Sequence, residues 1–258
     1  MRLTFLGTGT SFGVPQIGCD CAVCRSPDAR DRRTRVGALV ETDAGRRLLI
    51  DTPPELRLQL VAAGVGGVDA VLYTHDHADH THGIDDIRAF TARTSEPLAV
   101  YASPATASAL ARKFPYIFDD ALRPLPGTYK PEGRLRAIEE HETVEIAGVD
   151  VTPVRVPHGM AEVFAFRIGP LAYVTDAKTI PAAAMERLRG ARVLVVNALF
   201  RSPHPTHFSI PEAVAAAAAV GAERTYLTHL THKYAHAELE AELPPHVRPA
   251  YDGLTIEI

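Results

Sequence analysis

The segment His75-Asp76-His77-Ala78-Asp79-His80 decides the fold class, because five of its six residues can bind a metal ion. It follows the apolar run Ala70–Thr74, which is typical of a short buried strand. In an extended loop, His75 and His77 point to one side and can reach one cation. The turn that follows aims Asp79 and His80 at a neighbouring position. The segment therefore predicts two adjacent metal ions at the end of a strand.

One loop leaves two cations short of ligands, so further ligands must come from later strand ends. Three polar residues occupy such places: His158 after Val149–Val156, Asp176 after Leu171–Thr175, and His229 after Thr225–Thr228. Each of them alone could be an ordinary polar residue at a strand end. Their shared position favours ligands, and Asp176 is the natural bridging ligand because a carboxylate can contact two cations.

Most strand-like runs are short and apolar without alternation, which is typical of sheets covered on both faces. Besides the four runs named above, they are Leu3–Thr8, Val36–Thr42, Leu48–Asp51, Leu98–Tyr101, Val163–Ile168 and Val193–Asn197. Helices are expected between them, at Pro54–Ala63, Thr81–Arg93, Pro104–Phe114, Pro181–Leu188 and Ile210–Val220. The tail predicts two strands, Val247–Ala250 and Leu254–Ile258, around Asp252-Gly253, either as a hairpin or as a strand pair that is only joined by this turn. The pattern indicates a layered α/β architecture.

Composition narrows the class of protein. A chain of 258 residues with 46% hydrophobic residues can form one domain, so a single unit over residues 1–258 is expected. The formal net charge of −4 argues against a general attraction for nucleic acid. We find neither a targeting signal nor an apolar run of the ~18 residues that a membrane span requires. We therefore expect a cytoplasmic protein without a membrane partner.

Three cysteines form a second candidate metal site. Cys19, Cys21 and Cys24 are too few and too close together for a disulfide framework, but their thiolates suit zinc. A closed structural site needs a fourth ligand, and we choose His232, which a turn after His229 could send toward the cysteine loop. The alternative is three free thiols.

The order of these residues resembles the five-motif pattern of the metallo-β-lactamase superfamily. That resemblance implies a four-layer αββα sandwich and assigns Asp176 to both cations. By the same resemblance the remaining ligands are His75, His77 and His158 on the first cation, and Asp79, His80 and His229 on the second. Asp51 matches an early aspartate of the superfamily that supports the ligands without binding metal.

Further motifs resemble the phosphoribosyl cyclic phosphate phosphodiesterase (PhnP-like) family. They are Gly13-Val14-Pro15, the cysteine cluster, Leu227-Thr228-His229-x-x-His232 and Asp252-Gly253. This resemblance implies a structural zinc on three cysteines and a histidine, and a homodimer. It also implies hydrolysis of 5-phosphoribosyl 1,2-cyclic phosphate or a similar small cyclic phosphodiester. His207 matches an additional active-site histidine of the family, with His204 as its local rival.

The expected function is that of a metal-dependent phosphoric diester hydrolase with two divalent cations, zinc or manganese. A hydroxide between the cations would attack phosphorus, with Asp79 and His207 as catalytic residues. His207 would protonate the leaving oxygen or hold the phosphate. Two alternatives stay open: a ribonuclease Z-like or exonuclease activity on nucleic acid, and a non-catalytic accessory protein of the pyrroloquinoline-quinone biosynthesis type. The arginine run at 30–35 is either a solvated loop or a phosphate contact.

Overall fold

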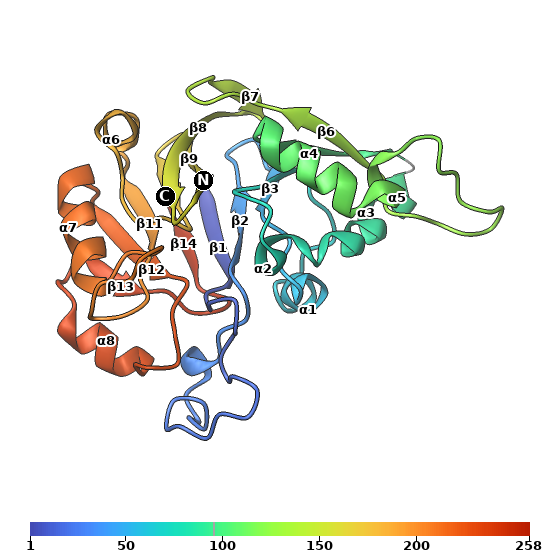
Figure 1. The fold of residues 1–258 in the computed structure, drawn as a ribbon. Helices are drawn as coiled ribbons and strands as arrows, with labels where there is room; N and C mark the ends of the chain where they lie inside the picture. The colour runs from blue at the N-terminus through green and yellow to red at the C-terminus, as the bar shows by residue number, and fades with distance from the viewer. Residues whose placement is uncertain (95) are drawn as a thin grey trace.

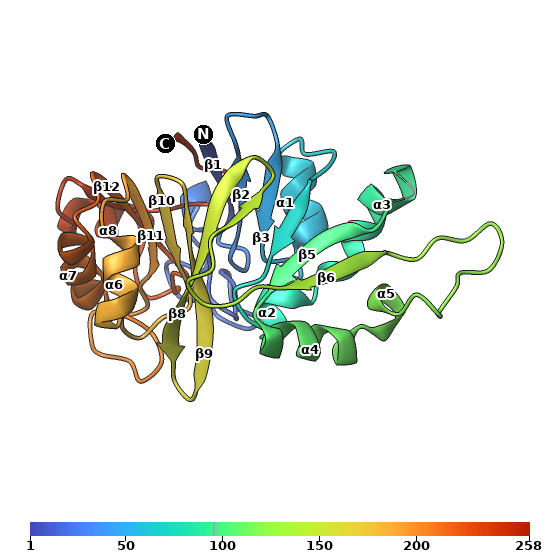
Figure 2. The same ribbon diagram turned by 90° about the horizontal axis from the view of Figure 1, so that it is seen from above.

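Two seven-stranded sheets pack face to face, and helices cover the outer face of each (Figure 1). The computed structural model describes residues 1–94 and 96–258. Seen from above, the α6–α8 layer lies outside one sheet and the α1–α5 layer outside the other (Figure 2). The predicted αββα sandwich is therefore confirmed.

The first sheet contains the N-terminal strands and the last strand of the chain. Its order is β14 (Thr255–Glu257), β1 (Arg2–Gly7), β2 (Gly37–Glu41), β3 (Arg47–Ile50), β4 (Ala70–Leu72), β5 (Leu98–Ala102) and β6 (Gly133–Ala137). The helices on its side are α1 (Leu56–Ala62), α2 (Ala78–Thr81), α3 (Arg88–Thr94), α4 (Pro104–Lys113) and α5 (Pro115–Phe118).

The second sheet contains the later strands in the order β13 (Val247–Pro249), β12 (Arg224–Thr228), β11 (Val193–Asn197), β10 (Leu171–Val174), β9 (Ala161–Ile168), β8 (Val149–His158) and β7 (Val144–Ile146). Helices α6 (Ala182–Leu188), α7 (Ile210–Val220) and α8 (His236–Glu242) cover it. In the part of the chain that the structure describes, no helix has the length and apolar character needed to cross a bilayer.

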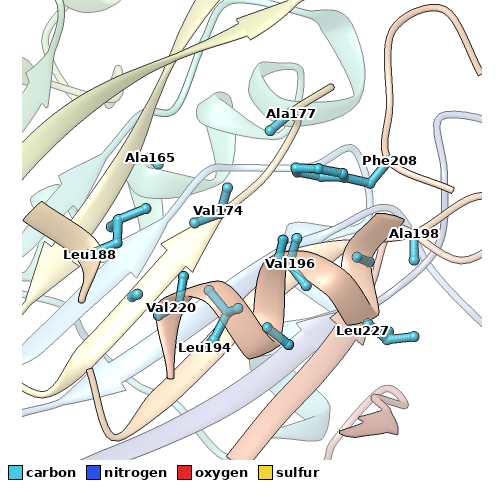
Figure 3. Packing of buried hydrophobic residues seen from close by; sticks show 14 of the residues in the cluster. Ala165, Val174, Ala177, Leu188, Leu194, Val196, Ala198, Phe208, Val220 and Leu227 are labelled. Atoms are coloured by element: carbon cyan, nitrogen blue, oxygen red, sulfur yellow. The ribbon is translucent and has the colours of Figure 1, made fainter. Parts of the chain in front are cut away.

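Strand β11 shows why the central strands are apolar throughout. All five of its residues are buried. Val193 and Val195 belong to the core between the sheets, whereas Leu194 and Val196 belong to the core beneath the helices. Figure 3 shows the second pair packed together with Val220 of α7. Both faces of the strand exclude water, so neither face selects polar residues.

Helix α7 begins and ends as its sequence predicts. Ser209 Oγ accepts from the Glu212 backbone N–H, and Glu212 Oε2 accepts from the Ser209 N–H at 2.7 Å. This reciprocal pair is a capping box. Gly221 follows the helix with φ 74°, which is the left-handed conformation that ends many helices.

The helix predicted over Thr81–Arg93 is wrong in its continuity. Helix α2 ends at Thr81, a 3₁₀ turn covers Ile84–Ile87, and α3 begins at Arg88. The break lies at Gly83, whose N–H donates to Thr52 O at 2.8 Å. A Cβ at Gly83 would lie 2.0 Å from Pro53 O, so only glycine permits this close approach of the backbones.

The two C-terminal strands are joined by the predicted turn, but the hairpin alternative is wrong, because the strands lie in different sheets. Strand β13 pairs in parallel with β12, whereas β14 pairs antiparallel with β1. The turn at Gly253, with φ 85°, carries the chain from one sheet to the other, and the Gly253 N–H donates to Phe5 O. Strands β6 and β7 and helices α5 and α8 are not among the elements that the sequence predicts.

Candidate metal centre

The strand ends of the two sheets meet at one edge and bring the predicted ligands together. The histidine-rich segment follows β4, and His77 is the N-cap of α2, so Asp79 and His80 lie in the first turn of that helix. From the second sheet, His158 ends β8, while Asp176 and His229 lie just beyond β10 and β12. The fold thus converts dispersed sequence positions into one site.

The ligand atoms form three overlapping groups, each with its atoms within 4.8 Å of one another. One is His75, His77 and His158; another is Asp79, His80, Asp176 and His229; the third is His158, Asp176 and His207. Asp176 and His158 therefore connect the two ligand sets that the sequence analysis assigned to separate cations.

The geometry of the second group fits a divalent cation. Asp176 Oδ2 lies 3.3 Å from both His80 Nε2 and His229 Nε2. Asp79 Oδ2 lies 3.6 Å and 3.7 Å from the same two nitrogens. Ligands at zinc distances of about 2.0–2.2 Å in a tetrahedron are separated from one another by roughly 3.3–3.6 Å. These groups are spaced as ligands of a shared ion.

Buried nitrogen atoms without hydrogen bonds also indicate metal binding. Among the described residues, the Nε2 atoms of His75, His80 and His229 are buried and make no hydrogen bond. An orphaned buried polar atom destabilises a fold unless a ligand satisfies it. Metal ions bound by the two ligand groups would satisfy all three.

Asp51 positions His80 from behind. The Asp51 side chain is fully buried and accepts three hydrogen bonds: from the Thr74 N–H at 2.9 Å, from Thr74 Oγ1 at 2.8 Å and from His80 Nδ1 at 2.7 Å. Burial raises the pKa of Asp51, whereas the neighbouring His80 opposes the shift. Because Nδ1 is engaged with the carboxylate, His80 presents Nε2 to the centre.

Two threonines that the sequence analysis did not identify orient other histidines. Thr74 Oγ1 lies 2.9 Å from His75 Nδ1. The backbone carbonyl of Thr206 accepts from His158 Nδ1 at 3.0 Å, and Thr206 Oγ1 lies 2.8 Å from His207 Nδ1. Thr74 is recognisable in sequence as the neighbour of His75, but Thr206 is brought to His158 only by the fold.

The two aspartates are held in the anionic form. Burial alone would raise the pKa of Asp176, but the charges of His229 and His80 outweigh it and hold this pKa well below its usual range. The pKa of Asp79 is likewise lowered, because the neighbouring imidazoles of His229 and His80 outweigh burial. The site therefore offers carboxylate oxygens ready to bind a cation.

His207, and not its rival His204, reaches the centre. The His207 side chain is 11% exposed, and its Nε2 lies 3.4 Å from Asp176 Oδ2. Burial lowers the pKa of His207 despite this carboxylate. The His204 ring lies beside it, 5.4 Å between centroids, and is not part of any ligand group.

Two of the four described non-glycine residues with positive φ lie at the site. Asp51 and His229 adopt positive φ angles of 62° and 56°. The left-handed region is costly for residues other than glycine, and such residues concentrate at functional sites. Both residues are buried, so the surrounding core holds them in these conformations.

The cysteine cluster forms a separate group with His232, as predicted. The His232 Nδ1 atom lies 3.3, 3.4 and 3.6 Å from the sulfur atoms of Cys19, Cys21 and Cys24. The Cys24 backbone N–H lowers the pKa of Cys21 to about 6, whereas burial raises the pKa of Cys24 to about 11. Three sulfurs around one imidazole nitrogen match the donor set of a closed zinc site.

Comparisons with known proteins agree with this geometry. The model of the beta-lactamase superfamily domain matches residues 46–230. A crystal structure described as a new diphosphatase from the PhnP family superposes with a TM-score of 0.90 at 41% identity, covering 99% of this chain and 97% of that one. The Zn²⁺-bound PqqB of Methylobacterium extorquens shares the fold, with a TM-score of 0.79 at 22% identity and 100% of each chain covered.

A curated relative from Porphyromonas gingivalis, named octanoyltransferase, is 41% identical over 259 residues, or 98% of this chain. The chain spans only 51% of the length of that relative. The superfamily match and the likeness to the diphosphatase each cover more than half of the chain and agree on one family. The chain thus belongs to the beta-lactamase superfamily and is related, within it, to the PhnP family.

Proposed function

We propose that this protein is a metal-dependent phosphodiesterase that hydrolyses a small cyclic phosphodiester such as 5-phosphoribosyl 1,2-cyclic phosphate. One observation carries the proposal: Asp176 lies between two sets of ligands and belongs to groups that contain members of both. Paired cations separated by about 3.5–4 Å are typical of enzymes that cleave phosphate esters. The PhnP relationship supports the same chemistry.

Two divalent cations, zinc or manganese, would lower the pKa of an attacking water and neutralise charge on the phosphate oxygens. The side chains of this protein would do the rest. Asp51 fixes the orientation of His80 through the 2.7 Å hydrogen bond. Thr206 directs the Nε2 atoms of His158 and His207 inward. His207 Nε2, which makes no hydrogen bond to another described residue, would donate a proton to the leaving oxygen or hold the phosphate.

Hydrolysis of a diphosphate is the second candidate, because the relative at 41% identity is described as a diphosphatase. Both reactions place water on phosphorus and differ in the leaving group, which is a sugar oxygen in one case and a phosphate in the other. The same cations and the same His207 would serve either reaction. Substrate identity therefore depends on the pocket beside the metal centre.

Three other functions receive less support. The net charge of −4 gives no general electrostatic attraction for nucleic acid, which argues against a nuclease. Binding of transfer RNA that weakens steeply with salt would instead support the nuclease alternative. An accessory role of the pyrroloquinoline-quinone type would leave the full ligand set without a use. Octanoyl transfer is the printed activity of a relative about twice as long, and the groups at the active centre here contain only histidine and aspartate.

The test is a panel of substrates presented to the purified protein loaded with zinc or with manganese. The panel contains a cyclic phosphodiester, bis(p-nitrophenyl) phosphate, a nucleoside diphosphate, transfer RNA and an octanoyl-carrier donor. We expect turnover of diesters, and His77→Ala or Asp176→Ala should reduce it at least 100-fold. His246→Ala, an exposed histidine outside every ligand group, is the control. Octanoyl transfer without release of any phosphate product would overturn the proposal.

A further inference from the structure

A cavity beside the candidate metal centre is lined by an arginine, Arg35, whose terminal nitrogen atoms make no hydrogen bond to another described residue. The cavity has a volume of about 270 Å³ and is lined by Ser11, Arg35, Pro54, Ala78, Asp79 and His82. Asp79 is also one of the candidate metal ligands. The cavity therefore adjoins the candidate metal centre.

The structure separates the roles of the arginine run at 30–35. Arg30 pairs with Asp28 at 2.8 Å and with Glu240 at 3.3 Å on the surface. Arg32 is exposed. Neither of the two lines the cavity.

Arg33 and Arg35 have different surroundings. Arg33 is fully buried and donates to the backbone carbonyls of Thr231 and Tyr234, so its role is to hold the loop after β12. Arg35 is the member of the run that lines the cavity. A basic run that is undivided in sequence thus supplies one arginine to the active-site region.

Arg35 is positioned by its own contacts. Its Nε lies 3.0 Å from Glu55 Oε2, and its backbone carbonyl accepts from Gln59 Nε2 at 2.9 Å. In the part of the chain that the structure describes, its Nη1 and Nη2 atoms make no hydrogen bond, and its ion pair is the one with Glu55. Glu55 thus engages one side of the guanidinium and leaves the other side for an acceptor. A planar guanidinium matches two oxygens of a phosphate group.

The surroundings suit a phosphate. The exposed Ser11 makes no side-chain hydrogen bond among the described residues and adds a hydroxyl to the lining. The exposed His82 has its Nδ1 atom 3.1 Å from Thr81 Oγ1. A water molecule takes about 30 Å³ of liquid volume, so the cavity can hold a phosphate group with the first atoms of a sugar.

We infer that this cavity binds a second, non-reacting phosphate group of the substrate, with Arg35 as the residue that determines this specificity. The inference rests on the proposed function for its kinetic test, because it names which cyclic phosphodiesters the same site prefers. A substrate that carries a phosphomonoester beside the scissile diester would contact the metal centre and Arg35 at once. A diester without that group would contact the metal centre alone.

The binding test does not depend on turnover. Ribose 5-phosphate is titrated calorimetrically into the zinc-loaded protein, its Arg35→Met variant and its Arg32→Met variant. Loss of a charge-assisted hydrogen-bonded pair predicts that Arg35→Met weakens binding about 10- to 100-fold. Arg32→Met removes the same charge from the same run outside the cavity and should bind within twofold of the unmodified protein. Equal affinity in the Arg35→Met variant would overturn the inference.

The kinetic test compares 5-phosphoribosyl 1,2-cyclic phosphate with ribose 1,2-cyclic phosphate, which lacks the second phosphate. Arg35→Met should lower the ratio of kcat/KM for the first substrate over the second about 10- to 100-fold, and Arg35→Lys should restore part of it. An equal loss on both substrates, together with a lower melting temperature, would show that Arg35 only supports the fold. If neither substrate is hydrolysed by the unmodified protein, the proposed function fails, and the titration alone decides the inference.

Discussion

The hydrogen bond between Asp51 and His80 makes a sharp prediction about metal affinity. The carboxylate only accepts, so a neutral His80 carries its proton on Nδ1 and would direct its Nε2 lone pair at a cation. In Asp51→Asn, the amide oxygen can keep the Thr74 N–H, which places the NH₂ group against His80 Nδ1. His80 would then accept at Nδ1 and carry its proton on Nε2, where it blocks the metal.

We expect Asp51→Asn to lower the affinity for metal more than it lowers the free energy of unfolding. Supporting partners of this kind change metal affinity by about 10- to 100-fold, which corresponds to roughly 1.4–2.7 kcal/mol. The free energy of unfolding of the metal-free protein should change less, because the amide removes a buried carboxylate whose pKa burial raises. The two quantities therefore move separately.

Zinc competition against a chromophoric chelator measures the affinity, and urea unfolding in the presence of chelator measures the stability. Asp252→Asn is a matched control, since Asp252 also accepts three hydrogen bonds, from Thr8 Oγ1, the Thr34 N–H and Thr34 Oγ1, without contacting a candidate ligand. Unchanged zinc affinity in Asp51→Asn, or an equal loss in both variants, would refute the tautomer argument.

Three further predictions address other parts of the molecule. Cys21→Ser should reduce bound zinc by one ion per chain and lower the unfolding temperature, as elemental analysis and a thermal scan would show. Gly83→Ala should lower the free energy of unfolding, measured with urea, by more than about 3 kcal/mol, because its Cβ would lie 2.0 Å from Pro53 O. Gly67→Ala is the control: a Cβ there meets open space, so the free energy of unfolding should change by less than about 1 kcal/mol. Burial raises the pKa of Asp252 to about 6, above its value in the unfolded chain, so protonation of Asp252 stabilises the fold. This contribution to the free energy of unfolding is complete below about pH 4 and is lost as the pH rises through 6. Relative to Asp252→Asn, the unmodified protein should lose at most about 3 kcal/mol between pH 4 and pH 8, and a constant difference would contradict the assignment.

The sequence could bring the candidate metal ligands together because each of them, or the segment that contains it, follows an apolar run. Such a run indicates a buried strand, and polar residues at its end lie at an edge of the sheet. His158, Asp176 and His229 could therefore be placed near the histidine-rich segment without knowing the path of the chain. Their assignment to individual cations came from family resemblance and stays a prediction, as does the expected homodimer.

The elements of the fold that the sequence did not predict depend on contacts between distant segments. Strand β6, Gly133–Ala137, alternates arginine with apolar residues at the edge of its sheet, so it carries no buried-strand signal. The Asp252-Gly253 pair is a normal hairpin signal, yet Thr8 and Thr34 bind the Asp252 side chain and the turn leads into another sheet. Local patterns report burial and turns, but they do not report which sheet a strand joins.

One short segment connects the two candidate metal sites, and this connection suggests what the cysteine cluster does for the other site. His229 and His232 are separated by two residues, and one belongs to the active centre while the other belongs to the cysteine group. His229 has φ 56° and, among the described residues, its ring nitrogen atoms make no hydrogen bond, so no partner behind the ring fixes it as Asp51 fixes His80. The stacked ring of His207, 4.8 Å away between centroids, and the backbone therefore position it. Arg33 holds that backbone at Thr231, and a metal ion on His232 would hold it one residue later. We therefore expect the loss of a metal ion from the cysteine group to loosen His229 before the sheets unfold.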